Sequence, residues 1–350
     1  MNLSEKRLLI VVQAVDLDDP LMGFFHEWLL EAAKQFSLIT VLALRVGRYA
    51  LPSHVRVHSL RPRGSRSRLR AAWTMWSMSW QLRHEYSAVF LRGDAQYVVL
   101  TGWLWRLLGK RIVLWYAHYK VNGWVWPASL IAHTITASVP AALSHPWVHA
   151  EYIGQNIPHE RFYQAPIETK TSELRMLTLG RVVRIKGIKE CVEAFIESGV
   201  APQSTLTIVG PRSDAAYEAE LTGIMARYPT VTWGPALIPY DQLPDQLRTY
   251  DILLNAYPAS LDKVIIESMM SGVIPIVTTE GLRSCLPAEL HWLIAPDQAS
   301  RAAAMQRISA LSIEERYALG QRLRHLAIEH HSLQGQLKRL QMICFPSSSS

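Results

Sequence analysis

The sequence predicts an α/β protein built from two doubly wound domains, each a parallel sheet with helices on both faces. Short continuous apolar runs, which are typical of strands buried on both faces, alternate with segments of helical periodicity. This alternation occurs twice, once in each half of the chain. A length of 350 residues also suits two domains.

The first domain is expected at residues 1–165. It begins with the apolar run RLLIVVQAV at 7–15, which predicts a buried first strand. Strand and helix patterns then follow each other as in strand–helix–strand units. The further elements expected here are a helix at 24–36 and strands at 38–44, 87–93, 111–118 and 134–138.

The second domain is expected at residues 166–340, after a polar, unpatterned stretch near 160–172. The final residues, 341–350, are expected to form a disordered tail. The predicted strands of this domain are 175–181, 204–210, 231–235, 251–256 and 273–279, and the predicted helices are 187–199, 214–227, 241–249 and 263–271.

Composition and cysteine usage exclude several classes of protein. Hydrophobic residues make up 49% of the chain and charged residues 19%, so a large core can be buried. No apolar run approaches the roughly 18–20 residues that span a bilayer, and the N-terminal apolar segment predicts a strand and no secretory signal. The single cysteines Cys191, Cys285 and Cys344 fit neither a disulfide framework nor a CxxC metal site. We therefore expect a protein of the reducing cytoplasm.

The positive charge is confined to the first half. Residues 1–165 hold 18 Lys and Arg against 10 Asp and Glu, a balance of +8, which leaves −1 for the rest of a chain whose net charge is +7. Such asymmetry indicates an anionic partner: a membrane surface, a nucleic acid or a phosphorylated substrate.

A loop with two cations follows the predicted strand 175–181. In the stretch GRVVRIKG (180–187), Arg181 and Lys186 stand where a strand gives way to a helix. Ligands of open α/β sheets bind at the carboxyl ends of strands, and a guanidinium with an ammonium can neutralise a diphosphate. Taken alone, the same residues could equally belong to a solvated loop.

The stretch NAYPASLDKVIIESMMSGVIPIV (255–277) contains a carboxylate in apolar surroundings. Glu267 lies on a short, otherwise apolar helix that begins near Lys263, with Ser260 or Asp262 as its N-cap. A helix start binds anions, and a carboxylate one turn further in can accept hydrogen bonds from ribose hydroxyls. A ligand with a phosphate and a hydroxylated ring would explain why Glu267 is there.

Together these stretches resemble the C-terminal, nucleotide-sugar-binding domain of family 4 glycosyltransferases. The matching pieces are LGRVVRIKG, LTIVGP and YDILLNAYPASLDKVIIESMMSGVIPIVT, with IVVQAVDLDDPLMGFFHEW and RIVLWYAHYKVNGW resembling the acceptor-side domain. The SLDKVIIESM form is similar to a variant in bacterial polysaccharide transferases. The resemblance implies a GT-B fold, in which two Rossmann-like domains face each other across a cleft, and a retaining, metal-independent hexosyltransferase without cofactors.

The resemblance also implies roles for individual residues. Arg181 and Lys186 would stabilise the departing nucleoside diphosphate, and His118 would face the donor sugar, although a histidine after an apolar run is also a common structural residue. The set implied to bind the UDP- or GDP-sugar donor is Glu267, Lys263, Val264, Ile265, Asp262, Gly210 and Gly23.

The sequence departs from the family pattern at one position. The family has two glutamates separated by seven residues in this segment; the second matches Glu267, but the first falls on Ala259. This change puts a contact with the donor sugar in question. Asp262 is the nearest carboxylate that could replace it, and we expect it instead to cap the helix.

The DLD motif at 16–18 resembles the metal-binding Asp-x-Asp of other sugar transferases. Its place directly after the first strand favours an ordinary turn, and no spaced His/Cys set accompanies it. We expect no metal site.

The segment 61–86 is both basic and aromatic. It carries five arginines, at 61, 63, 66, 68 and 70, and then Trp73, Trp76 and Trp80 on one helical face. Such a segment is typical of a helix on an anionic membrane surface, and equally of a core helix preceded by a solvated basic loop.

The sequence therefore predicts a glycosyltransferase of cell-surface polysaccharide or glycolipid assembly, acting on a glycan or lipid-linked acceptor. It would lie in the cytoplasm, peripherally on the inner face of the cell membrane. The alternative is a catalytically lapsed sugar-nucleotide-binding partner in a glycan-assembly complex. No nucleic-acid-binding module accompanies the arginines, so we expect no nucleic acid partner.

Overall fold

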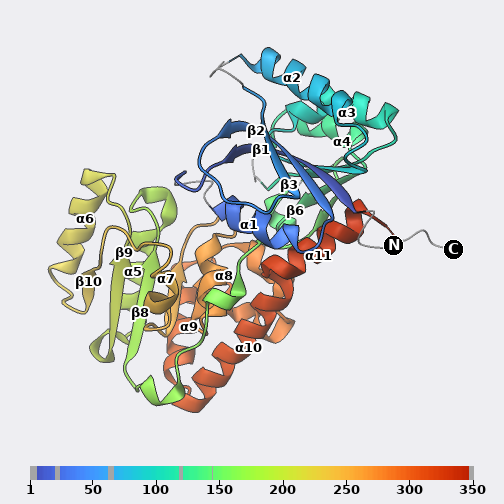
Figure 1. Cartoon of the computed structure of the whole chain (residues 1–350). Helices are drawn as coiled ribbons and strands as arrows, with labels where there is room; N and C mark the ends of the chain where they lie inside the picture. Colours follow the sequence, from blue (N-terminus) through green and yellow to red (C-terminus); the bar gives the residue numbers. More distant parts are fainter. Residues whose placement is uncertain (1–5, 20–23, 62–66, 118–120, 144, 347–350) are drawn as a thin grey trace. The chain divides into compact units, whose positions relative to one another are not determined.

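The computed structural model describes residues 6–19, 24–61, 67–117, 121–143 and 145–346 (Figure 1). The chain forms two compact units, Met1–Asn156 with Leu333–Ser350 and Ile157–Ser332. Each unit is an α/β domain with its own parallel sheet, as the sequence predicts. None of the described helices combines the length and the apolar character needed to cross a bilayer.

The first unit is a sheet in the order β3-β2-β1-β4-β5-β6-β7, and every neighbouring pair is parallel. The apolar run of β1 lies at its centre, where Ile10 is level with Val41 and Phe90 and fully buried. The strands are β1 (Arg7–Val15), β2 (Leu38–Val46), β3 (Val55–Ser59), β4 (Ala88–Arg92), β5 (Arg111–Trp115), β6 (Thr134–Ala137) and β7 (Ala150–Tyr152).

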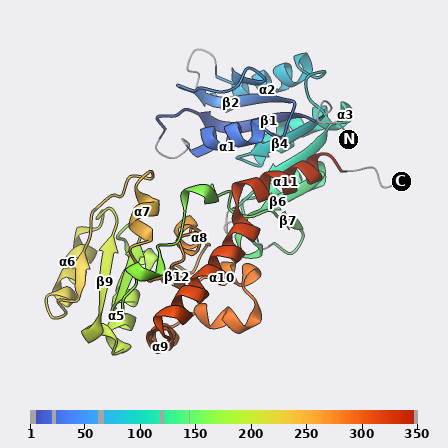
Figure 2. The same ribbon diagram turned by 60° about the horizontal axis from the view of Figure 1, so that its bottom comes forward.

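Helices cover both faces of this sheet. One face packs on α1 and α11, which share a core with β1, β2 and β4. The views show α1 on one side of these strands and α2 on the other (Figure 2). The helices of this unit are α1 (Phe24–Ala33), α2 (Arg68–Gln81), α3 (Gln96–Leu107), α4 (Val125–Ile131), α11 (Leu333–Cys344) and the 3-10 turn η3 (Pro140–Ala142).

The second unit is a five-stranded parallel sheet in the order β10-β9-β8-β11-β12. Its strands are β8 (Leu174–Leu179), β9 (Ser204–Val209), β10 (Val231–Trp233), β11 (Ile252–Asn255) and β12 (Ile274–Val277). Helix α5 packs against α9, and α8 packs against α10. Because the chain leaves β8 in one direction and β11 in the other, right-handed crossovers place α5 and α8 on opposite faces of the sheet.

The remaining bounds complete this unit. Its α-helices are α5 (Ile188–Glu197), α6 (Ala215–Met225), α7 (Leu243–Leu247), α8 (Lys263–Met270), α9 (Gln298–Ser309) and α10 (Ile313–His331). Its 3-10 turns are η4 (His159–Arg161), η5 (Ile167–Thr169), η6 (Arg184–Lys186), η7 (Ala201–Gln203), η8 (Glu280–Cys285) and η9 (Ala288–Leu293).

The domain boundaries differ from those expected at 165/166 and 340/341. The segment from Ile157 onward belongs to the second unit, where Phe162 is fully buried. The last helix returns to the first unit, because Leu337 and Leu340 are buried in its core and Gln336 accepts a hydrogen bond from the indole of Trp28 at 3.0 Å. The predicted disordered tail is therefore wrong for 341–346, which α11 and the residues after it occupy, while 347–350 lie outside the described residues.

Candidate functional site

The carboxyl ends of the second unit's strands form the candidate site. The chain order reverses between β8 and β11, since β9 and β10 extend the sheet on one side and β12 on the other. At such a reversal, neighbouring loops diverge and leave a crevice for a ligand. The two loops concerned are 180–187 after β8 and 256–262 after β11, which are the two stretches that the sequence singles out.

Glycines bring these loops together. Gly187 has a left-handed φ of 65°, and a Cβ on it would lie 2.8 Å from the carbonyl oxygen of Ala256. A Cβ on Gly210, after β9, would lie 1.8 Å from the carbonyl oxygen of Gly180. Gly210 therefore has a packing reason to be glycine, and its contact with a donor stays a prediction.

Lys186 and Asp262 join the two loops. Lys186 Nζ donates to Asp262 Oδ2 at 2.6 Å, and both side chains are largely buried. The amide nitrogen Nδ2 of Asn255 donates to the same carboxylate oxygen at 3.3 Å, and Lys186 Nζ lies 3.8 Å from the ring centroid of Tyr257. The ammonium is thus held between the two loops by a carboxylate and an aromatic face.

Asp262 is at the N-cap of α8, but its side chain does not cap the helix. The expected side-chain cap is wrong because the carboxylate pairs with Lys186 instead. Within the first turn, the amide of Ile265 bonds back to the carbonyl of Asp262 at 3.1 Å. The side chain of Asp262 is directed elsewhere and the backbone satisfies the Ile265 amide, so an anion at the helix start would meet a favourable dipole.

Glu267 lies one turn into α8 and is only 5% exposed. Among the described residues, no hydrogen bond to its carboxylate is present. Burial raises the pKa of Glu267 to about 7, an effect that the nearby charge of Lys263 opposes. A buried carboxylate with this pKa is poised to ionise when a ligand supplies hydrogen-bond donors.

Arg181 stands apart from the other cations of its loop. Arg184 and Lys189 both form ion pairs with Glu220 on α6, at 2.8 and 2.6 Å. Arg181 is exposed at the end of β8, and its side chain makes no ion pair within the described part of the chain. Arg181 is therefore available to an anionic ligand, whereas Arg184 and Lys189 are engaged.

Sequence reasoning missed two residues of this site. Asn255 and Tyr257 contact the Lys186–Asp262 pair directly, and Asn255 Oδ1 also accepts from the amide of Tyr257 at 3.2 Å. The available signal was a polar residue closing an apolar strand, since Asn255 ends β11 and is buried.

Three further candidates have different outcomes. His118 and Gly23 lie outside the described residues, so their roles stay predictions. The DLD motif forms a turn, in which Asp16 Oδ1 accepts from the amides of Asp18 and Arg48 at 3.1 and 3.2 Å. Asp18 also forms an exposed ion pair with Arg48. Through these contacts the motif connects the loop that follows β1 with the loop that follows β2.

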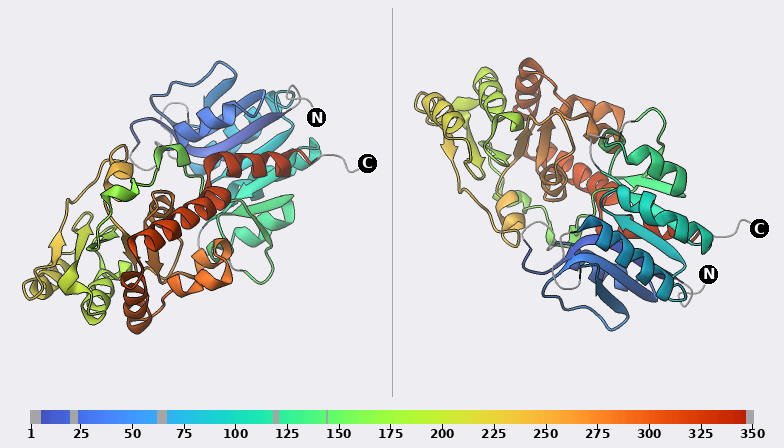
Figure 3. Two further views of the ribbon diagram at one scale, coloured as in Figure 1. Left: turned by 90° about the horizontal axis from the view of Figure 1, so that it is seen from below. Right: turned by 90° about the horizontal axis from the view of Figure 1, so that it is seen from above.

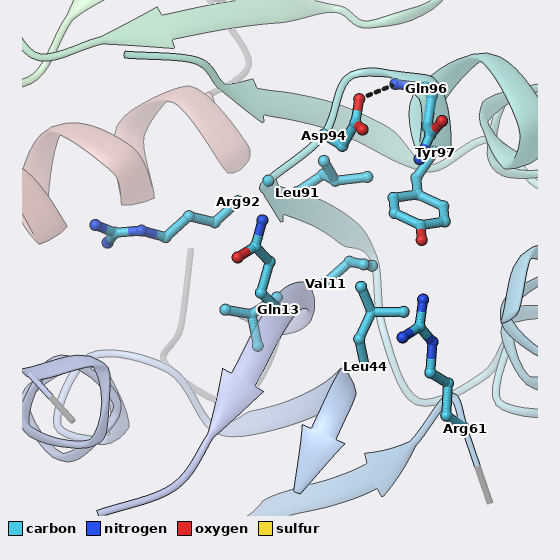
Figure 4. A pocket seen from close by; sticks show the side chains of 11 residues that line it. Val11, Gln13, Leu44, Arg61, Leu91, Arg92, Asp94, Gln96 and Tyr97 are labelled. Atoms are coloured by element: carbon cyan, nitrogen blue, oxygen red, sulfur yellow. Dashed lines mark hydrogen bonds between the residues drawn. The ribbon is translucent and has the colours of Figure 1, made fainter. Parts of the chain in front are cut away.

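The first unit has a cavity of about 130 Å³ at the carboxyl ends of β1, β2 and β4. This is the reversal point of that sheet, between β1 and β4. Figure 4 shows the guanidinium of Arg61 and the hydroxyl of Tyr97 pointing toward each other across it, while the side chain of Arg92 leads away. Arg61 Nε is buried without a hydrogen-bond partner in the described residues. The cavity can therefore offer unpaired donors to a polar ligand.

Comparisons with known proteins place this geometry in context. Residues 173–311 match the family model described as Glycosyl transferases group 1. The match lies within the second unit and contains both loops of the candidate site. No curated protein matches the sequence.

Solved structures resemble the chain over nearly its whole length. Alr3699/HepE of Anabaena in complex with UDP and glucose has a TM-score of 0.67 at 14% identity, covering 96% of this chain and 98% of that one. A glycosyltransferase from Rickettsia africae has a TM-score of 0.71 at 13% identity, covering 98% and 100%. A UDP-forming α,α-trehalose-phosphate synthase from Burkholderia xenovorans has a TM-score of 0.66 at 13% identity, covering 99% and 100%. The two α/β units thus have the fold of GT-B glycosyltransferases.

Proposed function

We propose that the protein is a retaining glycosyltransferase that moves a hexose from a nucleoside-diphosphate sugar to a glycan or lipid-linked acceptor. The observation that carries the proposal is the group of Arg181, Lys186, Asp262 and Glu267 at the reversal point of a sheet whose sequence matches a glycosyltransferase family. The solved complexes of HepE with UDP and with UDP-glucose support a nucleotide sugar as the donor.

The donor would use each feature of the site. Its diphosphate would lie between Arg181 and Lys186 and near the start of α8, where the first-turn amides of Lys263, Val264 and Ile265 and the helix dipole favour negative charge. Its ribose hydroxyls would donate to the carboxylate of Glu267, which otherwise has no hydrogen-bond donor in the described residues. Donation to the ionised carboxylate would offset its burial and lower its pKa.

The chemistry follows from where charge develops. As the bond between the sugar and the diphosphate breaks, negative charge builds on the departing phosphate oxygen, and fixed cations aimed there lower the barrier. Arg181 and Lys186 would supply this stabilisation without a metal. The ion pair with Asp262 keeps Lys186 in place, so little reorganisation is required during the reaction. A front-face reaction of this kind retains configuration and needs no protein nucleophile.

The acceptor would use the first unit. Its cavity, with Arg61 and Tyr97 as hydrogen-bond donors, suits a hydroxylated sugar. We propose a glycan or lipid-linked acceptor of cell-surface polysaccharide or glycolipid assembly, and the basic segment 61–86 supports an anionic membrane surface as its location.

Ala259 favours one alternative, a catalytically lapsed protein that binds a sugar nucleotide within a glycan-assembly complex. The two proposals differ in turnover. The purified protein would be screened against UDP- and GDP-sugars by thermal shift, and the stabilising donor then incubated with sugar acceptors while released nucleoside diphosphate is measured. Release of nucleotide supports the transferase. Stabilisation without release supports the lapsed protein, and no stabilisation by any nucleotide sugar contradicts both.

A further inference from the structure

Three neighbouring helices of the first unit expose large apolar side chains. Helix α3 lies between α2 and α4, and the views show the three side by side on the face of the sheet opposite α1 and α11 (Figures 1 and 3). A Cβ on Gly102 of α3 would lie 2.5 Å from a side-chain carbon of Ile131, so glycine allows α3 and α4 to pack closely. The three helices form one layer, and each has an outer surface.

Helix α2 has its tryptophans on that outer surface. Ala71, Met75 and Ser79 recur every four residues and are fully buried toward the unit. On the opposite side, Leu69 and the three tryptophans recur at spacings of four and three, and Trp73 is 68% exposed. Within the segment 61–86, α2 thus packs on the unit as a core helix would, but it does so through its smaller residues, and its tryptophans face outward.

Helices α3 and α4 repeat this arrangement. In α3, Leu100, Trp103 and Leu107 lie on one side, and Trp103 and Leu107 are 64% and 87% exposed. In α4, Trp126 and Leu130 are one turn apart and exposed. We call the outward side chains of these three helices the docking face; its members are Leu69, Trp73, Trp76, Trp80, Leu100, Trp103, Leu107, Trp126 and Leu130.

The charge around the docking face is predominantly positive. None of the three helices contains an Asp or a Glu. Arg70 is exposed on α2, and Arg83, whose guanidinium lies 4.7 Å from the ring centroid of Trp80, follows the end of that helix. Across residues 61–150 the sequence has eleven Lys and Arg and only two acidic residues, Glu85 and Asp94.

We propose that the docking face binds the surface of an anionic lipid bilayer. Tryptophan rings prefer the boundary between headgroups and acyl chains, and arginines beside them pair with lipid phosphates. No described helix is suited to span a bilayer, so α2, α3 and α4 would lie along its surface. The inference extends well beyond the segment 61–86, since α3 and α4 supply five of the nine residues of the docking face, and it holds independently of the proposed sugar transfer.

An anionic bilayer fits the face better than a protein partner or a second copy of this chain. Protein interfaces are also enriched in tryptophan and arginine, so the sign of the surrounding charge is the feature that distinguishes the two kinds of partner. Here the apolar residues are flanked by arginines and lack acidic residues on the three helices. Two copies placed face to face would bring arginine against arginine.

The test is cosedimentation of the full chain with vesicles of neutral phosphatidylcholine, and of phosphatidylcholine mixed with phosphatidylglycerol, at low and high salt. We expect the wild type to pellet with the anionic vesicles, and less so at high salt. The variants Trp103→Ser and Leu107→Gln, together or with Trp73→Ser, remove exposed side chains outside the protein core. Each added substitution should weaken vesicle binding, and the triple variant by about tenfold or more.

Met342→Gln is the matched control for Leu107→Gln. Met342 is also exposed and also in the first unit, but it lies on α11, which packs on the other face of the sheet. This variant should pellet like the wild type. Equal thermal unfolding midpoints would establish that all variants remain folded, and any variant that unfolds early is replaced by its single substitutions.

The contradicting results are definite. Wild-type protein that remains in the supernatant with both vesicle types overturns the proposal. So does a triple variant that pellets as well as the wild type. Light scattering tests whether the face instead binds a second copy of the chain. If the wild type is a dimer, the triple variant is a monomer and neither binds vesicles, the face is a self-association surface and the bilayer proposal is overturned.

Discussion

The ammonium of Lys186 lies 2.6 Å from the carboxylate of Asp262, and this contact connects the loop after β8 with the start of α8. It changes the roles of both residues. Asp262 is drawn away from the helix amides that an N-cap aspartate usually satisfies, and Lys186 is held between the loop after β8 and the start of α8. The pair therefore organises the charges that a diphosphate would meet.

Replacing Lys186 tests this organisation. Lys186→Met should lower the turnover of a nucleotide sugar about tenfold or more, because a cation aimed at the leaving phosphate is lost. Arg181→Ala should have an effect of similar size. The measurement is release of nucleoside diphosphate at saturating donor.

Matched controls exist on the same segment. Lys189 and Arg184 are paired with Glu220 on α6, so Lys189→Met and Arg184→Ala should leave turnover nearly unchanged. An equal loss in all four variants would mean that general charge matters, and that the position of Lys186 does not.

Glu267 should make the stability of the folded protein depend on pH. Its folded-state pKa is raised by burial from 4.5 to about 7, so between these values the folded chain keeps a proton that the unfolded chain has released. Stability therefore falls as pH rises through this window, by on the order of 3 kcal/mol. Glu267→Gln should remove that fall and be the more stable protein at pH 8. Urea unfolding at pH 5 and pH 8 measures the free energy of unfolding of both proteins. An equal change in this free energy between the two pH values for wild type and variant would contradict the prediction.

The same carboxylate should make donor affinity depend on pH. Ribose hydroxyls bind the ionised form, so affinity for a UDP-sugar, whose diphosphate does not titrate here, should increase from pH 6 to pH 8. Glu267→Ala should weaken binding by about 1–3 kcal/mol at pH 8. Calorimetry on both proteins at both pH values is the measurement. Unchanged affinity in a folded variant would rule out the ribose contact.

Gly187 tests whether the close approach of the two loops matters. Gly187→Ala places a Cβ at a left-handed φ and against Ala256, and should cost about 1–3 kcal/mol of stability. Gly199→Ala is the matched control, because its φ of 72° is similar and nothing lies within 4 Å of the added Cβ. We expect donor affinity to decrease only in the Gly187 variant. An equal loss of stability and of donor affinity in both variants would mean that backbone strain alone causes the effect.

Chelation tests the metal-free mechanism. Turnover should be the same with and without EDTA, since Arg181 and Lys186 supply the positive charge at the diphosphate. Loss of activity on chelation, restored by a divalent cation, would show that these side chains are not sufficient.

Much of the fold follows from local patterns in the sequence. Apolar runs such as 7–15 favour buried strands, and each predicted strand of the second unit is present. The segment 55–59, by contrast, forms the edge strand β3, and 150–152 forms the short edge strand β7; neither was predicted, because edge strands carry a weak apolar signal. The helix 96–107 was also missed, since its exposed side is apolar and hides the usual amphipathic period.

The sequence by itself determined which residues are available at the site, and it showed that they follow the ends of two strands. Only the tertiary structure decided what each does. Asp262 has the sequence context of a helix cap, yet it pairs with Lys186, which is distant along the chain and adjacent in space. Leu337 and Leu340 lie near the end of the chain, yet they complete the core of the first unit. Local periodicity and capping depend on neighbours within one turn, whereas ion pairs and core packing depend on how β8 and β11 are placed in the sheet.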